Sequence, residues 1–147
     1  MQEQSEQPLA PGLSARVELT VTDADTARAV GSGDVPVLGT PRVLALVEAA
    51  TVAATADDMP PGRTTVGLRV ELDHLAATPV GRTVAAHARL ATVDGRRLRF
   101  VVSVTDGAET VARGLVDRVL VDRQRFVERA GGARSDAAAG GRPAAAS

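Results

Sequence analysis

One segment constrains the fold more than any other part of this chain. It reads VLALVEAATVAATA, from Val43 to Ala56, and Glu48 is its only ionisable side chain. A helix that is apolar on every side is expected to be buried, because it leaves no face for water. A buried carboxylate without a partner is costly. Either this helix is less buried than its composition suggests, or Glu48 has a function.

The boundaries of this helix are marked by the residues around it. Thr40 followed by Pro41 is a typical helix start, with Thr40 as the N-cap and proline in the first turn. The sequence DDMPPG ends the helix after about Ala56. Before it, alternating apolar residues predict a half-buried strand over residues 13–21, and residues 23–29 favour a short helical turn.

Four further strands are predicted after the helix, near residues 64–75, 82–93, 96–106 and 109–121. The dipeptides Asp94-Gly95 and Asp106-Gly107 are hairpin signals, so the last three strands form an antiparallel meander. A sheet with one apolar face must bury it, and the long helix is the only candidate cover. The sequence therefore predicts an α+β fold with a curved antiparallel sheet wrapped around one long central helix.

The chain is divided into one domain and two flanking segments. Residues 1–12 are polar with two prolines and are expected to be a flexible lead-in. Residues 13–130 form the predicted domain, without internal repeats. Residues 131–147 are rich in Gly, Ala and Ser, and a low-complexity tail of this kind is expected to be disordered.

Composition excludes several classes of function. The net charge is −1, and the two aromatic residues, Phe100 and Phe126, are too few for a base-stacking surface, so no nucleic-acid partner is expected. The chain has no cysteine, which excludes disulfides and thiolate sites. No apolar run is long enough to span a bilayer and the start does not resemble a signal peptide, so no membrane association and a cytoplasmic location are predicted.

The polar residues that could support chemistry are few. Strand alternation points His74 toward the helix and His87 away from it, which leaves His87 as a surface residue. Each candidate has a structural explanation of its own. His74 could bond a backbone carbonyl, Glu48 could pair with an arginine such as Arg118, and Thr40 could serve only as a cap.

A functional interpretation is favoured over these structural explanations if Thr40, Glu48 and His74 meet where the sheet crosses the helix. A carboxylate stabilises a nearby imidazolium and holds its tautomer. The N–H groups of Gly39 and Thr40 at the helix start could receive a developing oxyanion. Together these groups suit acyl transfer or hydrolysis without a metal.

The spacing of these residues resembles a known family. Glu48 follows Thr40 by eight residues, His74 follows Glu48 by twenty-six, and Gly67 precedes His74 by seven. The stretches TPVG (78–81), VDGRRLRF (93–100) and Gly114 to Arg118 also match. Over roughly residues 13–130 the chain resembles the hotdog-fold thioesterases, most closely the fluoroacetyl-CoA thioesterase family.

The resemblance implies a role for each matched residue. His74 would be the general base or a proton shuttle, and Glu48 would be either its carboxylate partner or an acyl-accepting nucleophile. Thr40 would position the substrate or the attacking water. Gly39, Gly67 and Arg118 would contact the substrate, although a structural role for Arg118 is preferred. The implied partners are an acyl-CoA or acyl-carrier thioester and a second copy of the chain in a homodimer. No metal or cofactor is implied, since coenzyme A belongs to the substrate.

One segment departs from the family pattern. Residues 23–39 correspond to the lid over the acyl pocket, which carries aromatic side chains in the fluoroacetyl-specific enzymes and has none here. We therefore expect an acyl-CoA thioesterase for short or medium acyl groups with little preference for fluoroacetyl-CoA. Two alternatives are a hotdog enoyl-thioester hydratase and a non-catalytic acyl-thioester-binding module. The hydratase is disfavoured because Asp73 and His74 are adjacent and lie on opposite faces of a strand.

Overall fold

The computed structural model describes residues 9–140, with side chains described for 9–132. The helical segments are η2 (Asp23–Asp25), α1 (Ala27–Val30), α2 (Thr40–Thr55), η3 (Ala56–Asp58) and α3 (Arg123–Gly140). The strands are β1 (Ser14–Thr20), β2 (Arg63–His74), β3 (Thr83–Asp94), β4 (Arg97–Asp106) and β5 (Glu109–Asp122). The five strands lie within a residue or two of the ranges that the alternating patterns predict.

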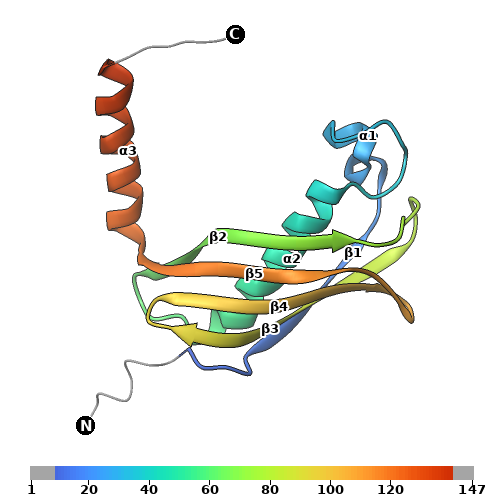
Figure 1. Cartoon of the computed structure of the whole chain (residues 1–147), viewed down its shortest axis with the longest axis horizontal. Helices are drawn as coiled ribbons and strands as arrows, with labels where there is room; N and C mark the ends of the chain where they lie inside the picture. Colours follow the sequence, from blue (N-terminus) through green and yellow to red (C-terminus); the bar gives the residue numbers. More distant parts are fainter. Residues whose placement is uncertain (1–8, 141–147) are drawn as a thin grey trace.

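The strands form one antiparallel sheet in the order β1-β3-β4-β5-β2, and α2 crosses one face of it (Figure 1). The two predicted hairpins join β3 to β4 and β4 to β5, and both turn glycines, Gly95 and Gly107, have φ of 61°, in the left-handed region. Strand β2 pairs only with β5, so its other side is a free edge of the sheet. This edge strand ends at His74.

The core lies between α2 and the sheet, as predicted. The helix buries Val43, Leu46, Val47 and Ala50. The inward residues of β3 that the alternation selects are all buried: Val84, Ala86, Ala88 and Leu90. Burial of this apolar surface is the main source of stability in such a domain.

The exposed side of α2 is also apolar, which a monomeric protein rarely shows over a continuous stripe. It consists of Pro41, Ala45, Ala49 and Val52, spaced so that they lie on one line along the helix. Val52 is 48% exposed. Glu48 borders this stripe with a side chain that is 31% exposed. The helix is therefore less buried than its composition suggested.

Two local expectations are wrong. The N-cap of α2 is Gly39, and Thr40 is the first helical residue, so the Thr40 side chain does not cap the helix. Leu68, expected on the inner face of β2, is 52% exposed, because the β2–β5 pairing shifts register between Gly67 and Arg69. A bulge of this kind turns the side chain of the extra residue out of the alternation.

A helix follows the last strand where none was expected. Asp122 accepts a hydrogen bond from the backbone N–H of Arg125 at 2.9 Å, which is the geometry of a capping carboxylate. Helix α3 then continues to Gly140, past residue 131 where the tail was expected to begin, and its alanines favour the helical state. It projects away from the sheet (Figure 1). The lead-in over residues 1–8 and the tail over 141–147 lie outside the described residues.

Within residues 9–140, no helix is long and apolar enough to cross a membrane.

Candidate active site

Thr40 and His74 meet where the start of α2 approaches the end of β2. The distance from Thr40 Oγ1 to His74 Nδ1 is 2.7 Å, which is a short hydrogen bond. Because Gly39 caps the helix, the threonine hydroxyl is available for the imidazole. Thr40 itself is exposed, so this pair faces solvent or a bound molecule rather than the core.

The surroundings of His74 favour its neutral form. Burial lowers the pKa of the imidazole below its usual value of about 6.5. Its Nε2 atom is buried and has no hydrogen-bond partner among the described residues. If Nδ1 carries the proton, it donates to Thr40 and leaves Nε2 as a free base. If Nε2 carries the proton, Thr40 donates to Nδ1 and its oxygen gains nucleophilic character.

The helix start offers one backbone donor rather than two. The Gly39 N–H donates to the Asp25 carbonyl at 3.0 Å, so it is not free to bind an oxyanion as the sequence suggested. The Thr40 N–H makes no backbone bond in the described part of the chain. Gly39 has another role, because a Cβ there would lie 3.0 Å from Ala27 Cα. The absence of a side chain lets the lid pack closely against the helix start.

Hydrogen bonds and β-bridges hold both ends of the lid over residues 23–39 in place. The Asp25 carboxylate accepts from Arg42 Nε at 2.9 Å and from the Thr22 backbone N–H at 2.7 Å, and these partners hold the Asp25 pKa below its usual value against the effect of burial. Bridges Thr26↔Leu38 and Val37↔Pro79 close the other end. Between these points, Ser32, Gly33 and Val35 line a pocket.

A cavity of about 350 Å³ lies between the lid and the Thr40–His74 pair. The lid residues that line it are all small or aliphatic: Ala27, Ser32, Gly33, Val35, Val37 and Leu38. A volume of this size suits a small acyl group, and the apolar wall suits its hydrocarbon part.

Glu48 lies at a different place, against β2 and β5. Its carboxylate accepts from Arg118 Nη1 at 3.0 Å, and a Cβ at Gly67 would collide with the same carboxylate oxygen. Arg118 also donates to the Thr65 side chain and backbone. Burial lowers the Arg118 pKa, with Glu48 acting in the opposite direction. The sequence reading of Arg118 as a structural partner of Glu48 thus fits the contacts of this residue.

Within one chain, Glu48 does not contact the Thr40–His74 pair. Glu48 follows Thr40 by two helical turns, about 12 Å along the axis. Gly67, beside Glu48, precedes His74 by seven residues, roughly 23 Å along β2. One chain therefore holds the Thr40–His74 pair at one end of α2 and the Glu48–Arg118 pair in its middle.

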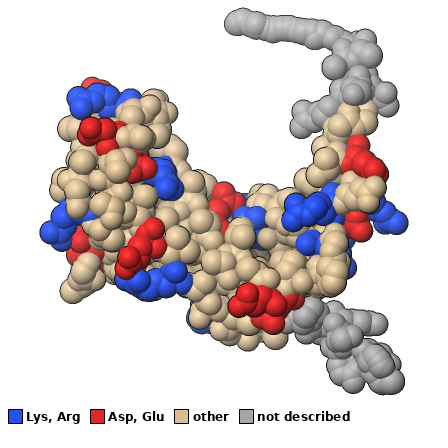
Figure 2. Space-filling view, turned by 180° about the vertical axis from the view of Figure 1, so that it is seen from behind, with Lys and Arg blue, Asp and Glu red and all other residues tan. Residues whose placement is uncertain are grey.

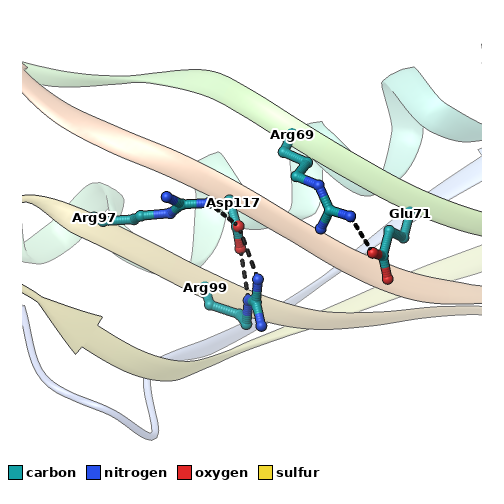
Figure 3. A network of polar contacts seen from close by, with 5 residues as sticks. All are labelled: Arg69, Glu71, Arg97, Arg99 and Asp117. Carbon is teal, nitrogen blue, oxygen red and sulfur yellow. Dashed lines mark hydrogen bonds and ion pairs between the residues drawn. The ribbon is translucent and has the colours of Figure 1, made fainter.

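The outer face of the sheet carries a separate set of charges (Figure 3). The Asp117 carboxylate accepts from Arg97 and Arg99, whose guanidinium groups lower its pKa to about 2. Arg69 pairs with Glu71, two residues further along the same strand, β2. His87 is also on this side, with Nε2 3.4 Å from Thr105 Oγ1, so neither the ion-pair network nor His87 belongs to the site.

Comparisons with known proteins show the family to which the chain belongs. The model of the family described as FlK, fluoroacetyl-CoA-specific thioesterase, matches residues 21–124. The chain belongs to the fluoroacetyl-CoA-specific thioesterase family. The fluoroacetyl-CoA thioesterase of Streptantibioticus cattleyicolor is 37% identical over 90 residues, which is 61% of this chain and 65% of that relative. The match thus spans a little less than two thirds of the relative's length.

Solved structures show the same fold. A variant of the FlK thioesterase in complex with fluoroacetate and CoA superposes with a TM-score of 0.75 at 30% identity, covering 80% of this chain and 99% of its own. A thioesterase superfamily member from Thermus thermophilus superposes with a TM-score of 0.78 at 25% identity, covering 89% of this chain and 98% of its own. A hot-dog-like protein from Thermanaerovibrio acidaminovorans superposes with a TM-score of 0.80 at 24% identity, covering 93% of this chain and 98% of its own. The predicted hotdog fold and the family resemblance are confirmed.

The sequence analysis did not identify two residues that contact the candidate site residues or their neighbours. Thr65 and Asp25 each hold an arginine, Arg118 and Arg42 respectively, through hydrogen bonds. Neither belongs to a motif that the sequence analysis recognised. A threonine two residues before Gly67 on the same face of β2 was the available signal for Thr65, since same-face residues share their surroundings.

Proposed function

We propose that this protein hydrolyses short or medium acyl-CoA thioesters, using Thr40, His74 and Glu48. The observation that carries the proposal is the Thr40–His74 hydrogen bond of 2.7 Å at the wall of a cavity whose other lining residues are small or aliphatic, in a chain of a thioesterase family. In direct hydrolysis, His74 takes a proton from water as the water oxygen attacks the thioester carbon. The C–S bond then breaks, and the departing thiolate receives the proton. Glu48 provides either the carboxylate for this step or the nucleophile of an acyl-glutamyl route.

A second copy of the chain would complete the site. In a two-fold dimer joined through the free β2 edges, antiparallel pairing centred near Val70 brings His74 of one subunit level with Gly67 of the partner subunit. Each site would then combine the Thr40–His74 pair of one chain with the Glu48–Arg118 pair of the other. This arrangement accounts for the separation of the two pairs within a single chain.

The surface of the chain supports this homodimer. Glu48 borders the apolar stripe on α2, and Leu68 is exposed on β2, the strand at a free edge of the sheet. Figure 2 looks onto the side that carries α2, and much of that surface is uncharged. Pairing of two β2 edges would satisfy their backbone groups and cover apolar surface at the same time. The cytoplasmic location and the choice between CoA and a carrier protein stay predictions.

The test is release of free thiol from a panel of fluoroacetyl-, acetyl-, butyryl- and a longer acyl-CoA. We expect hydrolysis of the short and medium substrates, with kcat/KM for fluoroacetyl-CoA within about tenfold of that for acetyl-CoA. Binding discriminates weakly between groups of such similar size unless a close-fitting lid enforces it, with small changes worth roughly 10- to 200-fold. The lid residues around this cavity are small and aliphatic.

Each other outcome identifies a competing function. A preference for fluoroacetyl-CoA of several orders of magnitude would show that a lid without aromatic residues is sufficient for selectivity. Hydration of an enoyl-CoA without thiol release would identify a hydratase. Tight binding of acyl-CoA with no turnover by the dimer would identify a binding module.

A side chain at Gly67 is expected to reduce activity by displacing the Glu48 carboxylate. The Cβ of Gly67→Ala would collide with Glu48 Oε2, which must then move away from its position beside Arg118. We expect kcat to fall about 10- to 100-fold, as for a catalytic group misplaced by about 1 Å. Gly132→Ala is the control, since a Cβ there meets nothing within 4 Å. Wild-type kcat in Gly67→Ala would rule out a fixed position for Glu48.

A further inference from the structure

Arg118 is held by more bonds than a partner of Glu48 requires. Its Nε donates to Thr65 Oγ1 at 2.9 Å, its Nη2 donates to the Thr65 carbonyl at 3.0 Å, and its Nη1 donates to Glu48 Oε2 at 3.0 Å. Arg118 is 7% exposed and Thr65 is 8% exposed. A guanidinium group is a rigid plane, so the edge that Thr65 fixes through Nε and Nη2 determines where Nη1 points.

The absence of a side chain at Gly67 leaves space for the Arg118 guanidinium and the Glu48 carboxylate. Gly67 is directly opposite Arg118 in the β2–β5 pairing, and Thr65 precedes Gly67 on the same face of β2. A Cβ at Gly67 would lie 3.6 Å from Arg118 Nη1, besides its collision with Glu48. Without that side chain, the guanidinium and the carboxylate share the space above β2, and Thr65 is the group that fixes the other edge of the guanidinium.

The outer face of the sheet fixes β5 at the same point. Asp117, the residue before Arg118, is 2% exposed and accepts bonds from Arg97 and Arg99 on β4 (Figure 3). Arg97 and Arg99 are 51% and 41% exposed, but the Asp117 carboxylate is buried and depends on their bonds, because without them it would be a buried charge without a partner. The backbone of Arg118 is thereby anchored on one face, and its side chain is anchored by Thr65 on the other.

We propose that Thr65 is a positioning residue for Glu48, acting through Arg118. The inference rests on the proposed function, because it assigns a role within that site. Thr65 does not touch the substrate cavity, whose lining residues are elsewhere. It sets the plane of the Arg118 guanidinium, and this plane sets the direction and position of the Glu48 carboxylate toward the reacting group. Arg118 is accordingly a positioning residue and not a substrate anchor.

Thr65→Val tests the proposal, because valine keeps the shape of threonine and removes the hydroxyl. We expect kcat for the best acyl-CoA to fall about tenfold or more with KM changed less than about twofold, which is the pattern of a misplaced catalytic group rather than of lost binding. Thr65→Ser keeps the hydroxyl and is expected to restore most of the rate. Thr64→Val is the matched control, since it is the same change at the neighbouring residue on the other face of β2.

A double-mutant cycle separates positioning from general damage to the fold. In a Glu48→Gln background the carboxylate is already gone, so Thr65→Val should have little further effect on the residual kcat. A merely structural role would lower the residual rate by the same factor as in the wild type. That result, or a Thr65→Val enzyme with wild-type kcat, would overturn the proposal. Thr65→Ala replaces Thr65→Val in both measurements if the valine variant does not fold.

A measurement on the folded protein keeps the proposal independent of turnover. The Arg118 Nε–H should exchange slowly with water in the wild type and in Thr64→Val, and at least about tenfold faster in Thr65→Val. The 13C resonance of the Glu48 carboxylate should move in Thr65→Val only. Unchanged spectra would overturn the positioning role. A wild type that releases no thiol from any acyl-CoA, with these spectral changes present, would contradict the proposed function and leave the contact between Thr65 and Arg118 established.

Discussion

His74→Ala is expected to lower kcat for acyl-CoA hydrolysis by about 10² to 10⁴-fold, the contribution usual for a positioned general base. The imidazole is the only titratable group in contact with the Thr40 hydroxyl among the described residues, and Thr40 and His74 both line the acyl cavity. Since burial lowers the His74 pKa, the neutral base persists below pH 6.5. Activity should therefore be lost only as the pH falls further, through this lowered pKa. A stopped assay of thiol release over a pH series measures both effects.

The comparison variants isolate the contribution of the ring. His87→Ala removes the other histidine, which lies on the outer face of the sheet, and should leave kcat unchanged. Thr40→Ser should retain more activity than Thr40→Ala, because only the hydroxyl contacts the imidazole. Thermal unfolding should show that His74→Ala remains folded, with a change in the free energy of unfolding of about 1 kcal/mol for one lost hydrogen bond. Wild-type kcat in folded His74→Ala would exclude this histidine from the mechanism.

Mixing two inactive variants is expected to restore activity. If each site takes His74 from one chain and Glu48 from the other, a dimer of one His74→Ala chain and one Glu48→Gln chain has one intact site and one doubly altered site. Random exchange gives about half mixed dimers, so the mixture should recover about a quarter of wild-type activity. Each variant alone should be nearly inactive. The measurement is thiol release after the variants are mixed, unfolded together and refolded.

The controls concern assembly. Light scattering of each variant at micromolar concentration should show a dimer, and tagged chains should co-purify from the refolded mixture. A mixture that forms mixed dimers and remains inactive would place Glu48 and His74 of the same chain in one site. A monomeric wild type with full activity would rule out the shared site altogether.

The order and extent of the five strands and of α2 were predictable because each has a strong local signal, whereas α3 was not expected. The alternation along β3 and the two Asp-Gly turns follow from side-chain periodicity and from turn geometry that favours glycine. The pairing order of the edge strands was not encoded locally. Neither was the bulge at Gly67, which exposes Leu68. A bulge is defined by the pairing of two strands, here β2 with β5, and this pairing is non-local in the sequence.

The candidate site residues could be selected from the sequence, but their contacts could not. Spacing selected Thr40, Glu48 and His74, yet sequence alone assigned Thr40 to the cap position that Gly39 occupies. Threonine and glycine are both accepted at an N-cap, so the choice depends on whether another group competes for the hydroxyl. His74 is that group, and it lies thirty-four residues further along the sequence. The same reasoning applies to Gly39, whose N–H is taken by the Asp25 carbonyl.

The tied ends of the lid make residues 31–36 a separable part of the molecule. The Asp25–Arg42 ion pair and the bridge between Thr26 and Leu38 close the segment at its base, so changes in its length or bulk need not shift the start of α2. Loops of this kind accept insertions at small entropic cost. If the proposed site is correct, evolution or engineering can change acyl preference through this one loop while Thr40 and His74 keep their geometry.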